Sequence, residues 1–393
     1  MGNAGMKTRR LFYENVYQKE FEAKVLACGE DDRGQYVVLD QTAFYPKGGG
    51  QPSDKGQLGE LQVTDVQYAG EEIRHYVNRP LEEGETVFGK IDWQRRFDLM
   101  QQHSGEHIVS GMIHEKYGYD NVGFHMGEVF ITIDLNGMLE KEQVEEIEML
   151  ANNYIWSAHD TKIFCPSENE RKNIVYRSKK ELTGEVRLVE FSGADRCACC
   201  GTHVENTGEI GMVKLISSRK FRDGVRIEMV SGKRAFDYLN IHCRENSQIA
   251  VDLSVKPEET QMAVAHLQEE IYQLRGKILK LQNEKYEMWA KQCQDKGNVV
   301  LFEKQMEAAE IRKCTDMILN TCKGICVFMS GDDESGYKYA IGQREGDIRS
   351  LVKEMNGALC GRGGGKPFFA QGSLQGKKDD IVTFFKDKSF EIL

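Results

Sequence analysis

Three cysteines and a histidine occupy the seven positions of the segment CACCGTH, residues 197–203. Thiolate and imidazole are ligands that suit zinc, but a zinc finger needs a second ligand pair at a fixed short spacing, and the sequence that follows has none. A redox-active pair formed by Cys197 and Cys200 would leave His203 without a role. The segment therefore predicts one half of a metal site whose other half lies elsewhere in the chain.

The segment RRFDLMQQHSGEHIVSGMIHEKYG, residues 95–118, supplies the other half. Its apolar residues recur at helical spacing, which predicts a helix that ends at Gly118. Two histidines four residues apart lie on one face of such a helix and can bind one ion. The two segments together predict a Zn²⁺ site with nitrogen and sulfur ligands: His103, His107, Cys199 and His203. The spacing leaves open which of the three cysteines in residues 197–200 is the sulfur ligand.

The string HSGEH also matches H-x-x-E-H, a pattern of zinc metallopeptidases in which Glu106 would act as the general base. This alternative explains the helix. It gives no role to residues 197–203, since such peptidases use a carboxylate as the third ligand. We keep the metallopeptidase as the weaker hypothesis.

The pairing of HSGEH with CCGTHVENTGEIG resembles the HxxxH and CxxxH motifs of the editing domain of alanyl-tRNA synthetase and of free-standing alanyl-tRNA editing proteins, the AlaX family. The segments TAFYPKGGGQPSDKG and FRDGVRIEMVSGKRA are similar to the family's glycine-rich segment and closing strands. Residues 356–376, NGALCGRGGGKPFFAQGSLQG, resemble the glycine-rich C-terminal domain of its long form. The four motifs follow the family's order and span most of the chain.

The resemblance implies a hydrolase that deacylates mischarged Ser-tRNA(Ala), with Gly-tRNA(Ala) as a further substrate. A pocket for alanine cannot strongly reject serine, so a second site is needed to remove it. At 393 residues we expect no ATP-using aminoacylation domain. The resemblance also implies that Thr42 contacts the serine side chain, and it assigns the shaping of the site to Gly48, Gly49, Gly50 and Gln51. A tRNA-binding module with a structural, non-catalytic zinc is the alternative.

The pattern of apolar runs predicts an α+β multidomain chain. Residues 1–90 alternate short apolar runs with turns, which is typical of a small β-barrel, here carrying the glycine-rich motif. Residues 91–247 mix helices and strands and form the zinc-binding α+β editing domain. Residues 248–296 form a helical linker or coiled coil, and residues 297–393 form a C-terminal α/β glycine-rich domain that binds tRNA. Within the last domain, residues 380–386 (DIVTFFK) are predicted to be a strand.

Apolar residues in the helical segment alternate between spacings of three and four, broken only at Lys285, as in a coiled coil: Val264, Leu267, Ile271, Leu274, Ile278, Leu281 and Met288. One use of this helix is a homodimer formed through it and the C-terminal domain. The other is a linker that folds back on its own domain.

The formal net charge is -10, which does not exclude a tRNA partner because phosphate binding depends on local basic patches. The basic residues predicted to contact tRNA are Arg95, Arg96, Arg177, Lys179, Lys180, Arg219, Lys220, Arg222, Arg362 and Lys366. The sequence shows no apolar signal segment and no membrane span, so we expect a cytoplasmic protein.

Overall fold

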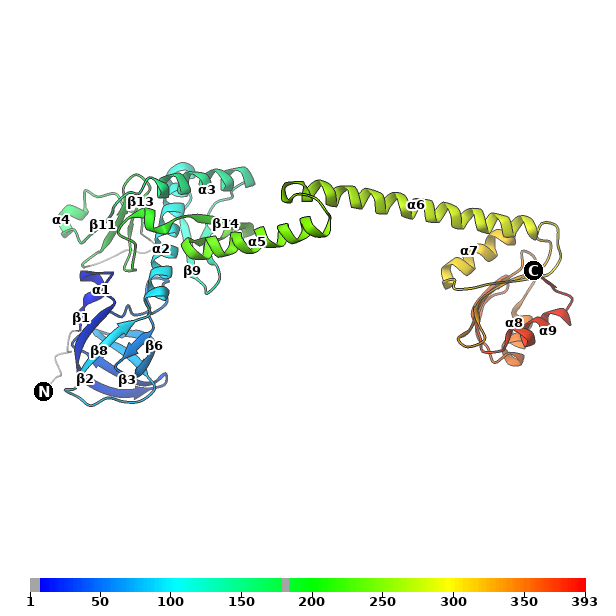
Figure 1. The fold of residues 1–393 in the computed structure, drawn as a ribbon, viewed down its shortest axis with the longest axis horizontal. Coiled ribbons are helices and arrows are strands. Elements are labelled where there is room, and N and C mark those ends of the chain that lie inside the picture. The colour runs from blue at the N-terminus through cyan, green and yellow to red at the C-terminus, as the bar shows by residue number, and fades with distance from the viewer. Residues whose placement is uncertain (1–7, 179–183) are drawn as a thin grey trace. The chain divides into compact units, whose positions relative to one another are not determined.

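The computed structural model describes residues 8–178 and 184–393 (Figure 1). The chain divides into two compact units, Met1–Gln248 and Ile249–Leu393. Both units combine helices with sheets, so the prediction of an α+β multidomain chain is confirmed. Two of the predicted tRNA contacts, Lys179 and Lys180, lie outside the described residues.

The first unit begins with a closed six-stranded barrel in the order β2-β3-β7-β6-β5-β8. Its strands are β2 (Glu20–Asp31), β3 (Gly34–Leu39), β5 (Gly56–Leu58), β6 (Leu61–Ala69), β7 (Glu72–Val77) and β8 (Thr86–Ile91). Along β2, the side chains of Phe21, Ala23 and Val25 are buried while their neighbours are exposed, the period of two expected of a strand with one face in a core. Beside the barrel, β1 (Arg9–Arg10) pairs with β4 (Gln41–Thr42), and α1 (Leu11–Glu14) follows β1.

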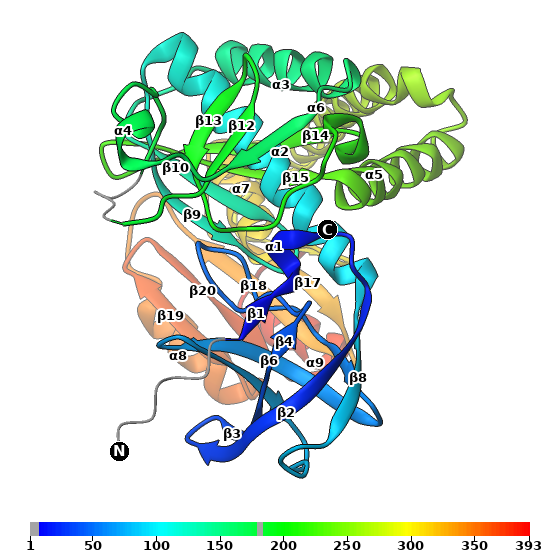
Figure 2. The same cartoon turned by 90° about the vertical axis from the view of Figure 1, so that its left-hand side faces the viewer.

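The predicted histidine helix is α2 (Trp93–Tyr117), which leaves the barrel directly after β8. Asp92 caps its first turn by accepting a hydrogen bond from the Arg95 N–H at 3.1 Å. Gly118, with φ of 70°, ends the helix in the left-handed conformation that favours glycine. Figure 1 and Figure 2 both show α2 leading from the barrel into the layer that contains α3 and β13.

That layer holds two antiparallel sheets. One has the order β14-β15-β10-β9, formed by Val213–Phe221, Gly224–Ser231, Ile131–Leu135 and Asn121–Met126. The other has the order β11-β12-β13, formed by Thr161–Phe164, Leu188–Phe191 and Asp195–Ala198. The helices α3 (Lys141–Trp156) and α4 (Glu168–Arg171) and the 3-10 turn η1 (Thr207–Ile210) complete it. One apolar cluster, including Ile108, Ile131 and Ile227, joins α2 to the four-stranded sheet.

The helix α5 (Gly232–Asp252) follows β15 and crosses the boundary between the units. The second unit contains η2 (Pro257–Glu259), the long helix α6 (Thr260–Gln292), and a sheet in the order β19-β20-β18-β17-β16-β21. The sheet strands, in that order, are Arg362–Lys366, Phe369–Leu374, Gly336–Gly342, Cys326–Asp332, Val299–Glu303 and Glu391–Ile392. Two apolar clusters pack this sheet against its helices α7 (Ala308–Ile318), α8 (Arg349–Ala358) and α9 (Lys378–Lys386).

The strand predicted at residues 380–386 is wrong, because this segment belongs to α9. Ile381 and Phe385 are four residues apart and both are fully buried, so the apolar run has one buried helical face. In the described part of the chain, no helix has both the length and the apolar composition needed to cross a membrane.

Candidate metal centre

Four side chains from two distant segments converge beside α2: those of His103, His107, Cys199 and His203. One ligand atom from each lies within 4.8 Å of all the others. Sγ of Cys199 is 3.5 Å from Nε2 of His103 and 3.4 Å from Nε2 of His203. A tetrahedral ion with zinc-like bond lengths would separate sulfur and nitrogen ligands by about 3.6 Å. The cluster therefore has the donor atoms and the spacing that a tetrahedral metal ion requires.

Each imidazole is oriented through its Nδ1 atom, which leaves Nε2 directed toward the cluster. The partner atoms are Oε1 of Gln51 at 3.0 Å for His103, Oδ2 of Asp195 at 2.8 Å for His107, and Oγ of Ser104 at 3.2 Å for His203. Partners of this kind fix the tautomer and ring orientation of metal-binding histidines. The three histidines are at most 4% exposed, so the rings are held in place by packing as well.

The three cysteines of residues 197–200 have different environments. Burial opposes ionisation of Cys199, but the surrounding imidazoles outweigh it and hold the pKa of this thiol well below its ordinary value. Burial raises the pKa of Cys197 to about 11. The side chain of Cys200 is exposed, and its carbonyl oxygen accepts a hydrogen bond from the Tyr13 hydroxyl at 2.8 Å. Among these three residues, the structure brings the Cys199 sulfur to the histidines.

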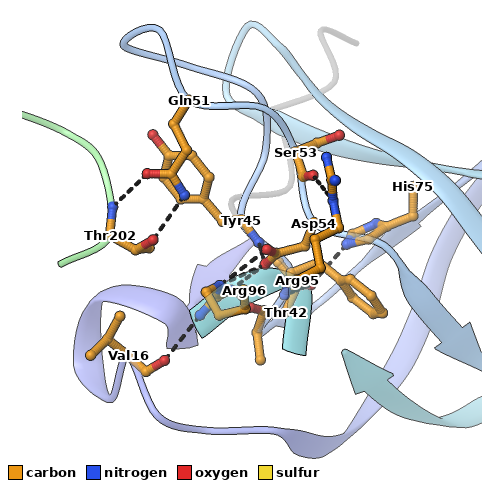
Figure 3. Close-up of polar contacts among 12 residues, drawn as sticks. Val16, Thr42, Tyr45, Gln51, Ser53, Asp54, His75, Arg95, Arg96 and Thr202 are labelled. Carbon is orange, nitrogen blue, oxygen red and sulfur yellow. Dashed lines mark hydrogen bonds and ion pairs between the residues drawn. The ribbon is translucent and has the colours of Figure 1, made fainter. Parts of the chain in front are cut away.

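The loop that carries these ligands passes unusually close to α2 at Gly201. A Cβ atom at this position would lie 2.2 Å from Cε1 and 2.3 Å from Nδ1 of His103. The amide of the next residue, Thr202, donates to Oε1 of Gln51 at 3.0 Å, and the Gln51 side-chain amide donates to the Thr202 hydroxyl at 2.8 Å (Figure 3). Gln51 therefore connects the glycine-rich loop to His103 on α2 and to Thr202 in residues 197–203.

A cavity of about 620 Å³ opens beside the metal ligands. Its wall includes backbone from the glycine-rich loop and side chains from α2, from β9 and from the segment after α4, namely Gly49, Gly50, Glu106, Asn121, Phe124 and Arg177. Of the residues predicted to shape the site, Gly49 and Gly50 lie in this wall. Gly48 is not part of this wall, and it pairs with Gln51 through backbone hydrogen bonds of 3.1 and 2.9 Å.

The structure does not bring Thr42 to the cavity wall. Its side chain is fully buried in the barrel, where the hydroxyl lies 2.8 Å from Nε2 of His75 and accepts a hydrogen bond from the Phe44 N–H at 3.1 Å (Figure 3). Burial lowers the pKa of His75 to about 4, so this imidazole is neutral at neutral pH. The contact between Thr42 and a serine side chain stays a prediction from the family resemblance.

Arg96 is not a phosphate ligand, and this part of the sequence prediction is wrong. The Arg96 side chain is fully buried and forms an ion pair with the equally buried Asp54 (Figure 3). Its remaining N–H groups donate to the carbonyl oxygens of Val16 at 3.0 Å and Ala43 at 2.6 Å. Asp54 also accepts from the Tyr45 N–H at 2.7 Å. The arginine therefore ties α2 to the loop of the glycine-rich motif.

The other predicted basic residues differ in accessibility. Arg95 is half-buried, and its Nε donates to the Ser53 carbonyl oxygen at 3.3 Å. Arg177 lines the cavity, but its Nε donates to Oδ1 of Asp195 at 2.7 Å. Exposed positions are occupied by Arg219, Lys220 and Arg222 near the β14–β15 turn, and by Arg362 and Lys366 on the edge strand β19.

Sequence reasoning missed the residues that support the metal ligands. Asp195 and Ser104 contact the rings of His107 and His203, and Asn121 contacts Glu106 in the cavity wall. Ser104 and Asp195 lie within four residues of predicted ligands, so proximity to the motifs was the available signal. Asn121 had no such signal, because β9 reaches α2 only through the fold.

Three family models match the chain in succession. Residues 5–95 match tRNA synthetases class II (A), residues 186–228 match the threonyl and alanyl tRNA synthetase second additional domain, and residues 295–388 match the DHHA1 domain. The second match contains the cysteine and histidine ligands of the loop. Relatives named alanyl-tRNA editing protein Aarsd1-A, from Xenopus laevis, and Aarsd1, from Danio rerio, are 29% and 26% identical to the chain.

Over most of its length the chain is similar to the alanyl-tRNA editing proteins. The alignments cover 88% of the chain and 85% of the Xenopus protein, and 96% of the chain and 97% of the Danio protein. An alanine--tRNA ligase from Ignicoccus hospitalis is 30% identical over 98% of the chain, which spans only 42% of that ligase. The C-Ala domain of Aquifex aeolicus alanyl-tRNA synthetase matches 24% of the chain and 94% of its own length, at 21% identity and a TM-score of 0.21.

Proposed function

We propose that the chain is a zinc-dependent hydrolase that removes serine from mischarged tRNA(Ala), with glycine as a second acyl group that it can remove. The observation that carries this proposal is the four-ligand cluster, which lies at the wall of a cavity bordered by the glycine-rich loop. The names of the editing relatives support tRNA carrying the wrong amino acid as the substrate. A purely structural metal would not require such a cavity beside its ligands.

The residues of the chain have separable tasks in this reaction. His103, His107, Cys199 and His203 would hold Zn²⁺, which when bound supplies a Lewis acid for ester hydrolysis. Gln51 and Asp195 keep two of the imidazoles in a fixed tautomer. The backbone of Gly49 and Gly50 leaves room along the cavity wall for the aminoacyl group and the terminal nucleotide.

The direct test is release of labelled amino acid from Ser-tRNA(Ala), Ala-tRNA(Ala) and Ser-tRNA(Ser) by the whole chain, before and after zinc removal. We expect fast zinc-dependent release from Ser-tRNA(Ala) alone. Cys199→Ala should abolish zinc binding and hydrolysis, while the matched variant Cys200→Ala keeps both, because the Cys200 side chain is exposed and outside the cluster. Binding of tRNA without release of any amino acid would favour the non-catalytic module.

We propose that the C-terminal unit binds the tRNA backbone. A second cavity, of about 600 Å³, is lined there by basic and aromatic side chains: Arg312, Lys313, Arg344, Lys366, Phe368 and Phe369. The Phe368 ring is 51% exposed, with Nζ of Lys366 at 5.9 Å from its centroid. Cations beside exposed aromatic rings suit phosphates and unstacked bases. Within this unit, residues 297–393 would form the last part of a four-part chain divided near residues 90, 247 and 296.

We also propose that α6 pairs with α6 of a second copy. Six apolar residues at heptad spacing are between 40% and 64% exposed: Val264, Leu267, Ile271, Leu274, Ile278 and Leu281. They alternate β-branched residues and leucine, the arrangement favoured in two-stranded parallel coiled coils. Sedimentation should give a dimer whose dissociation follows protein concentration, and Ile271→Lys should give a monomer.

A further inference from the structure

Glu106 lies in the wall of the cavity next to the metal ligands, between His103 and His107 on α2. Its side chain is almost completely buried, with 4% of the residue exposed. Among the described residues that line this cavity, Glu106 supplies the one carboxylate. A buried carboxylate that faces a cavity is costly unless a cation or strong donors compensate its charge.

One oxygen of this carboxylate is held by neutral donors. Oε1 accepts hydrogen bonds from the Ser110 hydroxyl at 2.6 Å and from the side-chain amide of Asn121. Asn121 is itself fixed, because its Oδ1 accepts from the Gly123 N–H at 3.1 Å. These contacts hold the carboxylate in one orientation without neutralising its charge.

The second oxygen, Oε2, accepts no hydrogen bond from any residue that the structure describes, and the carboxylate forms no ion pair with them. Among the described residues that line the cavity, Arg177 supplies a cationic side chain. Its Nε is committed to Asp195 at 2.7 Å, and Asp195 in turn orients His107. The described walls of the cavity therefore offer Oε2 no hydrogen-bond donor, and the one cation that they bring near the carboxylate, Arg177, acts on it through charge alone.

We propose that Glu106 binds the α-ammonium group of the aminoacyl ester, and this inference rests on the deacylase function proposed above. An amino acid esterified through its carboxyl group carries a positive charge and no negative one. An ammonium group in a buried cavity needs a charged acceptor, and the Glu106 carboxylate is the acceptor available beside the metal ligands. The contact would orient the ester and select acyl groups that have a free amine.

The experiment compares two esters of the same tRNA, Ser-tRNA(Ala) and its deaminated counterpart glyceryl-tRNA(Ala), in which a hydroxyl replaces the amine. Glu106→Gln keeps the shape and the acceptor for Ser110 but removes the charge. We expect kcat/KM for the seryl ester to fall about 10- to 100-fold, the range for a hydrogen bond to a charged group, while the glyceryl ester changes by less than about threefold. The matched control Glu115→Gln, exposed on the same helix, should change neither.

Binding of the stable analogue 3′-deoxy-3′-(L-serylamino)adenosine gives a second readout. Its affinity should fall in Glu106→Gln by a factor similar to kcat/KM, and the affinity of the glyceryl analogue should not. Zinc content must remain one ion per chain in both variants for the comparison to hold. An equal loss on both esters would overturn the inference, because Glu106 would then serve the chemistry or the fold. Absence of seryl hydrolysis by the wild-type chain would instead overturn the deacylase proposal itself.

Discussion

Replacing Arg96 with methionine tests whether this residue acts inside the fold or on tRNA. The substitution removes the guanidinium from a position where both it and Asp54 are fully buried. Asp54 would keep the hydrogen bond from the Tyr45 N–H but lose its counter-ion. The carbonyl oxygens of Val16 and Ala43 would lose their donors as well.

Breaking a buried ion pair by removing one partner costs about 3 to 5 kcal/mol. In a unit of this size, 1 kcal/mol shifts the unfolding midpoint by roughly 2 to 4 °C, so we expect Arg96→Met to lower the Tm by about 6 to 20 °C. The double variant Arg96→Met/Asp54→Leu removes both charges and should recover part of this loss. The neighbouring Arg95→Met, which removes a half-buried arginine, should shift the Tm by only a few degrees.

The assay combines thermal unfolding followed by circular dichroism with tRNA binding at several salt concentrations. A destabilised Arg96→Met protein, studied below its Tm, should bind tRNA with an unchanged salt dependence. If its stability instead equalled that of the wild type and the salt slope fell by about one, Arg96 would be a phosphate contact and our account of the buried pair would be refuted.

Four further outcomes are expected. His107→Ala should lose the metal ion and the deacylase activity together, measured by elemental analysis and serine release; retention of one tightly bound ion would contradict the ligand set. Thr42→Val should lower the free energy of unfolding by about 1 kcal/mol through the lost hydrogen bond to His75, whereas a selective loss of Ser-tRNA(Ala) hydrolysis at unchanged stability would support the serine-sensing role. The pKa of His75 is about 4 in the folded chain and about 6.5 when unfolded, so the neutral imidazole stabilises the folded state by about 3 kcal/mol above pH 6.5. This stabilisation is lost as the pH falls toward 4. Urea unfolding of His75→Gln should therefore show a free energy of unfolding that depends less on pH than that of the wild type. Lys366→Ala should weaken tRNA binding at fixed salt and leave the hydrolysis of a short aminoacyl minihelix unchanged, and unaltered affinity in filter binding would remove this residue from the interface.

The cluster of four side chains that could hold a metal ion could be predicted from the sequence, because its chemistry is carried by residue type and short spacing. His103 and His107 are one helical turn apart, and the cysteine and histidine of the loop are four positions apart. The helix that carries the two histidines could also be predicted, from the helical spacing of its apolar residues and from the glycine at its C-terminal end. These signals lie within short stretches of sequence, so they can be recognised before the fold is known.

The roles of Arg96 and Thr42 could not be predicted in this way. Arg96 sits in a basic pair that is typical of a surface, and its partner Asp54 lies 42 positions away. The hydroxyl of Thr42 meets His75 across the barrel, 33 positions along the chain. Residues 380–386 were misassigned for a different reason, because a short apolar run is compatible with either a strand or one buried face of a helix such as α9.

The short distance between Gly201 and the His103 ring limits which residues can replace this glycine. Any side chain there would start within 2.3 Å of the His103 ring, so even alanine would push the imidazole away from Gln51 or lift the loop from α2. The adjoining Cys200 is exposed and lies outside the four-residue cluster. Saturation mutagenesis of the two neighbours should therefore yield opposite outcomes, with broad replacement at position 200 and glycine alone at position 201.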